Sequence, residues 1–247
     1  MQPTTTVDVL AVGAHPDDVE FHAGGTLLHL ASLGYSTGIL DLTRGESATR
    51  GTPEIRAAEA EAAARVLGLR HRSCLDLGDG QLADTLATRT AVALAFRRLQ
   101  PRLVLTHHWD QPHPDHVATA RIVTAAAYLA GLANWQPVPS LLRHRPGRVA
   151  HFGLPHSVQP TFIVDISAWA SKKDEAIRCH RSQLHDAASA APASAVSSPD
   201  HLDRLDAIHR YYGTLIQARY GEAFVTRGIL SVEDPVRLLS GPMDILP

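Results

Sequence analysis

The chain has 247 residues, of which 45% are hydrophobic and 19% charged, a length and composition that suit one α/β domain with a sizeable core. Its formal net charge of −2 argues against nucleic-acid binding as the main role, and no apolar run approaches the roughly 20 residues that cross a bilayer. We see no signal peptide, and we expect Cys74 and Cys179 to be reduced thiols of a cytoplasmic protein.

Apolar runs typical of buried strands alternate with helical patterns over residues 1 to about 135. In chain order the expected elements are strand 7–13, helix 19–33, strand 36–42, helix 52–67, strand 73–77, helix 84–99 and strand 103–106. Thr52 suits a helix N-cap, Pro53 the first helical position and Gly68 a left-handed helix end. Such alternation predicts a parallel sheet with right-handed crossovers.

The second half of the chain is less regular. It predicts a strand over 161–166, a helix over 168–184 and a helix over 201–220. Residues 186–199 are mostly Ala, Ser and Pro, and we expect a surface loop there, either an active-site flap or a disordered bridge. No internal repeat or linker is evident, so we expect a single domain of residues 1–247.

Two similar clusters each follow an apolar run. His15-Pro16-Asp17-Asp18 follows strand 7–13, and His113-Pro114-Asp115-His116 follows strand 103–106. Open α/β sheets place their ligands at the carboxyl ends of parallel strands. One His-Pro-Asp string alone is more often an ordinary turn, but two at equivalent strand ends favour a metal site with a base for hydrolysis.

His15, Asp18 and His116 form a set of nitrogen and oxygen donors that suits a catalytic zinc site with one open position. The same donors also accept iron or cobalt. Asp17 adjoins Asp18 and is free to act as a base towards a metal-activated water. His113 lies off the metal in this interpretation, where it stabilises an oxyanion or protonates a leaving amine.

Other polar residues receive simpler interpretations. We expect Asp115 to orient the His113 imidazole. His22 is interpreted as a packing or rim residue, and His107 and His108 as strand-end or partly buried histidines without a metal. The surface groups are His180, His185 and His209.

Two other classes of protein remain as alternatives. A nucleotide-binding or methyl-transfer module is disfavoured because Gly13-Ala14-His15-Pro16 replaces the glycine-rich phosphate loop. A non-catalytic metal-binding protein would bind zinc without hydrolysing a substrate. The absence of a G-x-S-x-G segment leaves little support for a serine hydrolase.

Longer segments surround both clusters, namely Ala14-His15-Pro16-Asp17-Asp18-Val19-Glu20, Gly24-Gly25-Thr26-Leu27 and His113-Pro114-Asp115-His116. They resemble the zinc-dependent N-deacetylases of the LmbE/PIG-L family. Segments 43–46, 49–56, 75–80, 162–167, 197–199 and 220–226 are similar to its bacillithiol-biosynthesis branch. The resemblance implies a Rossmann-like, mostly parallel sheet flanked by helices, in an enzyme that removes acetyl groups from N-acetylglucosamine units.

Carried over by residue, the resemblance implies a function for each polar group. The implied zinc ligands are His15, Asp18 and His116, and the implied base is Asp17. His113 is the implied general acid or oxyanion partner, and the implied sugar-binding residues are Glu46, Arg56 and Asp79. The implied substrate is N-acetylglucosaminyl malate, with a mycothiol precursor or a chitin fragment as alternatives. Relatives also suggest a homo-oligomer, a trimer or a hexamer, without nucleic-acid or membrane partners.

The chain departs from the family pattern in two places. His22 stands where relatives usually carry a small residue, and the segment 151–159 differs from the aromatic-rich stretch expected near the substrate. A family tyrosine that polarises the carbonyl group therefore has no clear counterpart. These differences affect the expected substrate more than the expected chemistry.

Overall fold

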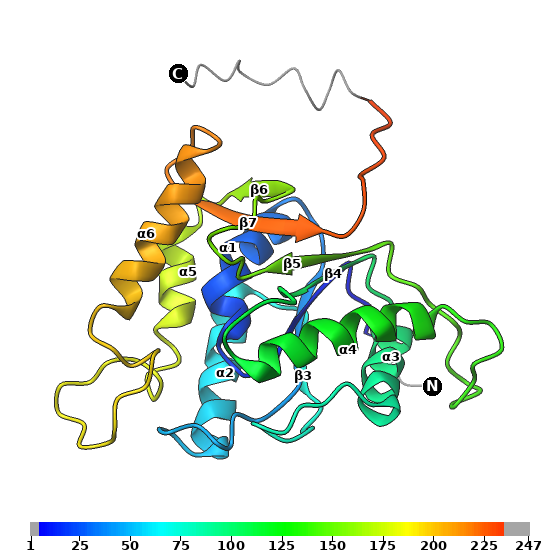
Figure 1. The fold of residues 1–247 in the computed structure, drawn as a ribbon, viewed down its shortest axis with the longest axis horizontal. Helices are drawn as coiled ribbons and strands as arrows, with labels where there is room; N and C mark the ends of the chain where they lie inside the picture. Colours follow the sequence, from blue (N-terminus) through cyan, green and yellow to red (C-terminus); the bar gives the residue numbers. More distant parts are fainter. Residues whose placement is uncertain (1–4, 235–247) are drawn as a thin grey trace.

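The computed structural model describes residues 5–234, in which seven strands form one mixed sheet of order β3-β2-β1-β4-β5-β7-β6 (Figure 1). The strands are β1 (Val9–Gly13), β2 (Thr37–Asp41), β3 (His71–Cys74), β4 (Leu103–His107), β5 (Arg148–Phe152), β6 (Phe162–Asp165) and β7 (Gly221–Thr226). Strands β1 to β5 pair in parallel, whereas β7 is antiparallel to both β5 and β6. The predicted fold class, a mostly parallel sheet flanked by helices, is confirmed.

Helices cover both faces of the sheet (Figure 1). They are α1 (Asp18–Ser32), α2 (Pro53–Leu67), α3 (Leu86–Leu99), α4 (Pro114–Ala130), α5 (Ala170–Ile177) and α6 (His201–Thr214). Successive side chains of a strand point to opposite faces, so Leu10 and Val12 of β1 pack with α3 and α4, whereas Val9 and Ala11 pack with α1. One apolar core therefore lies on each side of the sheet.

The local signals around α2 are confirmed. The Thr52 hydroxyl accepts a hydrogen bond from the Ile55 N–H at 3.3 Å, and Pro53 is the first helical residue. Gly68 adopts a left-handed conformation, with φ of 66°, at the end of the helix. These features depend only on neighbouring residues, which explains why the sequence predicts them.

Several predicted elements differ from the structure. Strand 73–77 is instead His71–Cys74, helix 168–184 ends at Ile177, and helix 201–220 ends at Thr214. Strands β5 and β7 were not predicted, since β5 carries polar residues at both Arg148 and His151. Among the described residues, 186–199 contain neither helix nor strand, in agreement with the predicted loop.

A buried ionic group joins α1, α5, α6 and β7. The Lys173 ammonium donates to Glu222 Oε1 at 2.6 Å and to the Phe21 carbonyl at 2.8 Å, and it lies 2.8 Å from His209 Nε2. Glu222 in turn accepts the main-chain N–H groups of residues 25 and 26. The expectation that His209 is a surface group is wrong, because its partner Lys173 comes from another helix.

Another buried contact lies just after α5. The His180 side chain is fully buried, and its Nε2 lies 3.0 Å from Glu20 Oε1. The expectation of a surface position for His180 is therefore wrong too, because a carboxylate from α1 forms an ion pair with it inside the protein. His185 is exposed, as expected.

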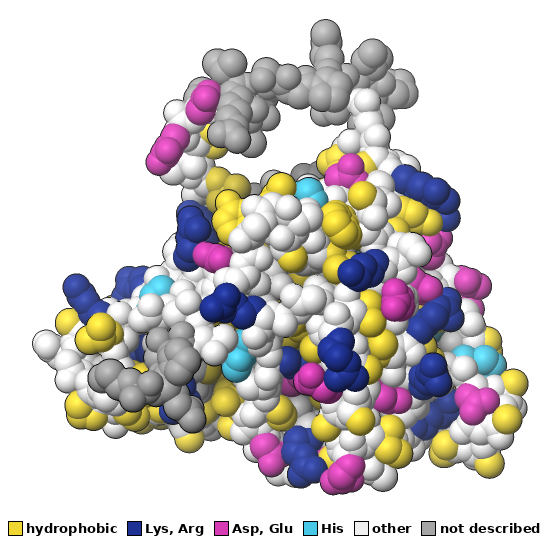
Figure 2. Space-filling model, turned by 180° about the vertical axis from the view of Figure 1, so that it is seen from behind, with side chains coloured by type: hydrophobic (Ala, Val, Ile, Leu, Met, Phe, Trp, Pro, Cys, Tyr) yellow, Lys and Arg dark blue, Asp and Glu magenta, His cyan; other side chains and the backbone are white. Residues whose placement is uncertain are grey.

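The surface agrees with the weak net charge. On the face seen from behind, Lys and Arg side chains lie among Asp and Glu side chains (Figure 2). Within residues 5–234, no helix is both long and apolar enough to cross a lipid bilayer.

The Lys173 contacts generate a stability prediction. Changing Lys173, which is 3% exposed, to Met leaves the buried Glu222 carboxylate without its cation, and we expect a loss of about 3–5 kcal/mol in the free energy of unfolding. Urea denaturation measures this free energy. The matched variant Lys172→Met changes an exposed neighbour and should shift it by less than about 0.5 kcal/mol. Equal effects of the two variants would contradict the structural role of Lys173.

Candidate active site

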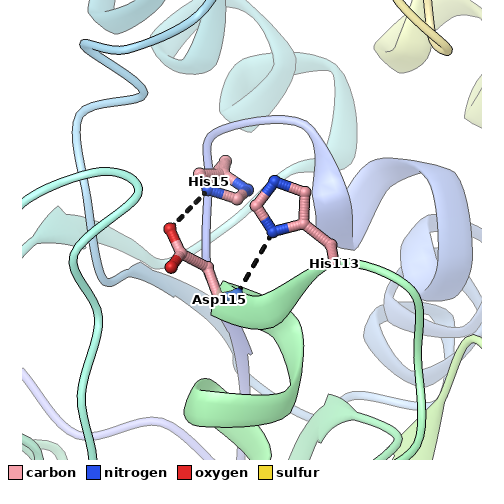
Figure 3. A group of neighbouring side chains, drawn as sticks. All are labelled: His15, His113 and Asp115. Atoms are coloured by element: carbon pink, nitrogen blue, oxygen red, sulfur yellow. Dashed lines mark hydrogen bonds and ion pairs between the residues drawn. The ribbon is translucent and has the colours of Figure 1, made fainter.

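The two His-Pro-Asp clusters meet at one edge of the sheet. The first follows β1 and leads into α1, and the second lies at the beginning of α4, which follows β4. Because β1 and β4 are parallel neighbours, their carboxyl ends lie side by side. Figure 3 shows the outcome, with His15 from the first cluster close to His113 and Asp115 from the second.

Asp18 lies among three imidazoles. Its Oδ1 is 3.2 Å from His116 Nε2, and its Oδ2 is 3.1 Å from His107 Nε2 and 3.4 Å from His15 Nδ1. Burial acts in the opposite direction, but the imidazoles of His116 and His107 hold the pKa of Asp18 well below its usual range. The three predicted ligands, His15, Asp18 and His116, are thus brought together.

The structure adds His107 to this group. Its ring is fully buried and stacks on that of His116, with centroids 3.9 Å apart. Burial, reinforced by the nearby His116, lowers the pKa of His107 to about 4. The expectation of a buried histidine was correct, but its contact with Asp18 was missed, since His107 and His108 are consecutive and the sequence does not indicate which of them faces the site.

Carboxylates surround the His15 imidazole. Its Nε2 lies 3.0 Å from Asp79 Oδ1 and 3.3 Å from Asp115 Oδ2, while Asp18 lies on its Nδ1 side. Burial disfavours the charged ring, but hydrogen bonds with Asp18 and Asp79 outweigh it and raise the pKa of His15 to about 11. The site thus favours a positive charge at this point.

The donor atoms fit a bound metal ion. One donor atom from each of His15, Asp18 and His116 lies within 4.8 Å of the other two, and the same is true of His15, His113 and Asp115. Imidazole nitrogens and carboxylate oxygens are suitable ligands for zinc and related divalent metals. Surplus carboxylates around His15 make the arrangement more favourable for a cation than for an empty pocket.

Asp17 has an unusual backbone conformation. Its φ is 128°, a region that residues with a side chain rarely adopt and that is associated with functional sites. Asp17 is buried, and burial raises the pKa of its carboxyl to about 6, although the Arg56 guanidinium acts in the opposite direction. A buried carboxylate next to Asp18 is placed to accept a proton at the metal site.

Arg56 is buried and contacts Asp17. It is 3% exposed, and its Nη2 donates to the Pro16 carbonyl at 2.6 Å and to Asp17 Oδ2 at 3.2 Å. Nη1 donates to the Gly45 carbonyl at 3.1 Å, and a Cβ at Gly45 would collide with the guanidinium. The Arg56 guanidinium, which the resemblance assigns to sugar binding, is therefore directed to the loop that carries Asp17.

Glu46 and Asp79 contact each other, and Asp79 lies beside His15. Glu46 Oε1 accepts the Asp79 N–H at 2.8 Å, and Asp79 Oδ2 accepts the Ser47 N–H at 2.9 Å. Glu46 is exposed. The structure thus gathers these two residues, both predicted to bind a sugar, on the β2 and β3 side of the metal cluster.

His113 is exposed and is oriented by the backbone. Its Nδ1 accepts the Asp115 N–H at 3.2 Å, which leaves Nε2 to carry a proton. The Asp115 carboxylate instead accepts the Gly80 N–H at 2.7 Å and approaches His15. The predicted orienting contact of this carboxylate with His113 is therefore wrong, because the carboxylate is directed away from His113 (Figure 3). Burial, and also His116 and His15, lower the pKa of His113.

Gln111 is a further residue that the sequence did not indicate. Its Oε1 lies 2.6 Å from His116 Nδ1, and its Nε2 donates to the Gly153 carbonyl. A hydrogen bond at one ring nitrogen orients a histidine so that the other nitrogen binds a metal. Glutamine is rarely a metal ligand itself, so only the spatial contact identifies it.

A second ionic group supports the beginning of α1. Arg72 pairs with Glu20 of α1 and donates from Nε to Asp41 Oδ2 at 2.9 Å. Burial acts in the opposite direction, but Arg72 and His180 lower the pKa of Glu20 to about 2. Glu20, two positions after Asp18, is thus tied to β2 and β3.

Comparison with known proteins agrees with this geometry. The sequence model of the PIG-L family, described as GlcNAc-PI de-N-acetylase, matches residues 10–127. The chain is 30% identical over 187 residues to a diacetylchitobiose deacetylase of Thermococcus kodakarensis, covering 71% of this chain and 70% of that protein. The chain belongs to the PIG-L family.

Other relatives of this PIG-L chain differ in reaction or are known by structure. It is 29% identical over 197 residues to a 4-oxalmesaconate hydratase of Pseudomonas putida, covering 74% of this chain and 76% of that protein. The crystal structure of the conserved protein TT1542 from Thermus thermophilus has 38% sequence identity and a TM-score of 0.83, with 92% of this chain and 98% of that one covered. The relatives therefore include both a deacetylase and a hydratase.

The contact between Gln111 and His116 can be tested by metal binding. We expect Gln111→Ala to weaken zinc affinity about 10- to 100-fold, because the His116 ring loses the hydrogen bond that orients it. Competition with a chromophoric chelator measures this affinity without any substrate. The control Gln136→Ala changes another glutamine, which follows α4. Unchanged zinc affinity in Gln111→Ala would rule out this orienting role.

Proposed function

We propose that this protein is a zinc-dependent deacetylase, which hydrolyses the N-acetyl group of an N-acetylglucosamine conjugate and releases acetate and the free amine. The observation that carries the proposal is the convergence of His15, Asp18 and His116 with the buried Asp17 at one edge of the sheet. The similarity to a deacetylase of a related amino sugar supports the same reaction.

In this proposal His15, Asp18 and His116 hold the metal. We prefer this set to His15, His113 and Asp115 because the His116 ring is oriented by Gln111 while His113 is exposed. Three protein ligands with an open position are typical of catalytic zinc. A bound zinc ion supplies Lewis acidity, which lowers the pKa of water and polarises a carbonyl group.

Asp17 acts as the general base. Its carboxylate accepts a proton from the attacking water, and the hydrogen bond from Arg56 fixes the direction of the carboxylate. The oxygen of that water forms a bond to the amide carbon, and the carbon–nitrogen bond then breaks. His113 presents its Nε2–H to the developing oxyanion, because its Nδ1 is occupied as an acceptor. The proton that Asp17 took from the water passes to the departing nitrogen.

The sugar lies on the side of Glu46 and Asp79 in this proposal. Both offer carboxylate oxygens, which form strong directional hydrogen bonds with sugar hydroxyl groups. Arg56 contributes through Asp17, since its guanidinium already contacts that carboxylate and two main-chain carbonyls.

The conjugate attached to the sugar is best identified with a panel of substrates. The resemblance to the bacillithiol branch puts N-acetylglucosaminyl malate first, followed by a mycothiol precursor and chitin fragments. Arg44 and Arg50 lie close in sequence to Glu46 and could pair with the malate carboxylates, but both already have partners. Arg44 pairs with Glu54, and Arg50 donates to the carbonyls of Leu184 and Ala191.

A hydratase is the alternative that the Pseudomonas relative raises. It would add water to a carbon–carbon double bond of an unsaturated polycarboxylate, and Asp17 could serve that reaction as well. Acetate release from N-acetylglucosaminides, compared with loss of the double-bond absorbance of an unsaturated polycarboxylate, distinguishes the two reactions. Hydration without acetate release would overturn the proposed function.

Removing the base gives the first prediction for this function. Asp17→Asn should bind zinc normally but lower kcat for acetate release about 10²- to 10⁴-fold, because asparagine cannot accept the proton. Acetate is measured enzymatically, and zinc content is measured on the same sample. Asp203→Asn, at an exposed position of α6, serves as the control. Substantial turnover by Asp17→Asn would contradict the role assigned to Asp17.

The two histidines of the second cluster should behave differently. His116→Ala should lose most of its bound zinc, because it removes a ligand. His113→Ala should keep its zinc and lose turnover, because it removes the hydrogen-bond donor to the oxyanion. Metal analysis after dialysis, together with acetate release, compares the two variants. The reverse pattern would favour the second donor set, in which His113 is a ligand.

A further inference from the structure

A cavity lies next to the metal cluster, on the side away from Asp79. Its volume is about 680 Å³, within the usual range for small-molecule sites. Its walls come from α6, from the beginning of β7 and from the loops that follow β4 and β5. None of the residues that we assign to the metal, the base, the oxyanion or the sugar lines it.

Two residues join this cavity to the metal cluster. His22 lines the cavity and lies four residues after Asp18 on α1, a spacing that puts both side chains on one face of the helix. Gln111 also lines the cavity and contacts His116. The cavity thus begins directly behind Gln111 and His22, next to the metal cluster.

The lining of the cavity is largely apolar. Leu154 and Pro155 come from the loop after β5, and Leu205, Ile208 and Tyr212 come from α6. Chain carbons that enter the cavity would lose contact with water against these side chains, which favours binding in proportion to the apolar area buried.

The cavity offers little to an anion. Among the described residues that line it, none is Lys or Arg. Asp110 contributes an exposed carboxylate, and His156 an exposed imidazole. His209 and Glu222 are already engaged with Lys173. Burial lowers the pKa of His22 to about 3, so this imidazole is neutral. A carboxylate placed here would meet no Lys or Arg side chain and would share the cavity with Asp110.

The order of strands determines which part of a substrate reaches the cavity. The proposed sugar-binding residues, Glu46 and Asp79, follow β2 and β3, and the metal cluster follows β1 and β4. The cavity comes next, at β4, β5 and β7. An amide has its nitrogen substituent on one side of the carbonyl carbon and its acyl chain on the other. With the sugar towards β3, the acyl chain points towards β5.

We propose that this cavity is an acyl-chain site, so that the enzyme hydrolyses N-acylglucosaminides whose acyl group is uncharged and longer than acetyl. The inference rests on the proposed function, because it uses the sugar position assigned there. The reaction remains a balanced hydrolysis. Water forms the new carbon–oxygen bond, the carbon–nitrogen bond breaks, the nitrogen gains a proton, and the chain leaves as a fatty carboxylate.

The test uses zinc-loaded protein and methyl β-glucosaminides that carry N-acetyl, N-butanoyl, N-hexanoyl, N-octanoyl or N-succinyl groups. Release of the free amine gives kcat/KM for each. We expect kcat/KM to rise about fourfold per methylene while the chain is buried. The N-succinyl compound should be slower than N-butanoyl, because it brings a carboxylate into a cavity that no Lys or Arg side chain lines. Fastest release of acetyl, with a fall for every longer chain, would overturn the proposal.

A variant of the cavity wall tests its location. Ile208→Glu introduces a carboxylate at a position that is 39% exposed, so the fold should tolerate it. The ratio of kcat/KM for N-hexanoyl to that for N-acetyl should fall roughly tenfold or more, since a charge replaces apolar surface. Leu215→Glu is the matched control, since Leu215 follows the same helix at 36% exposure and lies outside the cavity. An equal ratio in both variants would contradict the assignment.

Two further arms separate this inference from others. If octyl N-acetyl-β-glucosaminide gains from its chain and the acyl series does not, the cavity binds the aglycone and the acyl assignment is wrong. Release of acetyl alone would leave the proposed function standing and overturn this inference. If no acyl group of any length is released, both fail.

Discussion

Negative charge concentrated at one edge of the sheet is the constraint on which the site depends. Asp18, Asp79 and Asp115 all lie within 3.4 Å of the His15 ring, and Asp17 is buried next to Asp18. Carboxylates buried so close together are costly unless cations lie among them. This requirement accounts for the raised pKa of His15 and for the fit of the donor atoms to a metal ion.

The surrounding fold supplies the positive charge that keeps this edge in place. Arg56 contacts Asp17 and the Pro16 carbonyl, and thereby supports the strained backbone of Asp17. Arg72 and Lys173 form buried ion pairs that tie α1 to distant strands. A reactive group can occupy an unfavourable conformation only when neighbouring contacts stabilise it. The buried ion pairs that hold α1 therefore help to keep the site residues in place.

The sequence was informative where neighbouring residues decide the structure. The alternation of strands and helices, and the position of each cluster directly after a strand, predicted the mostly parallel sheet and the edge at which the clusters meet. It was uninformative for β7, whose antiparallel partner β5 lies far away in the chain. Likewise His180 and His209 were misplaced, because their partners Glu20 and Lys173 lie on other helices.

By itself the sequence determined which chemical groups stand at the ends of β1 and β4, and hence a site of imidazoles and carboxylates. Only the tertiary structure decided how these groups are shared. It directed the Asp115 carboxylate to His15 instead of His113, it brought Gln111 to His116, and it formed a cavity from α6 and the loops after β4 and β5. The physical reason is that residue order controls local backbone conformation, whereas the direction and surroundings of a side chain depend on packing between segments far apart in the chain.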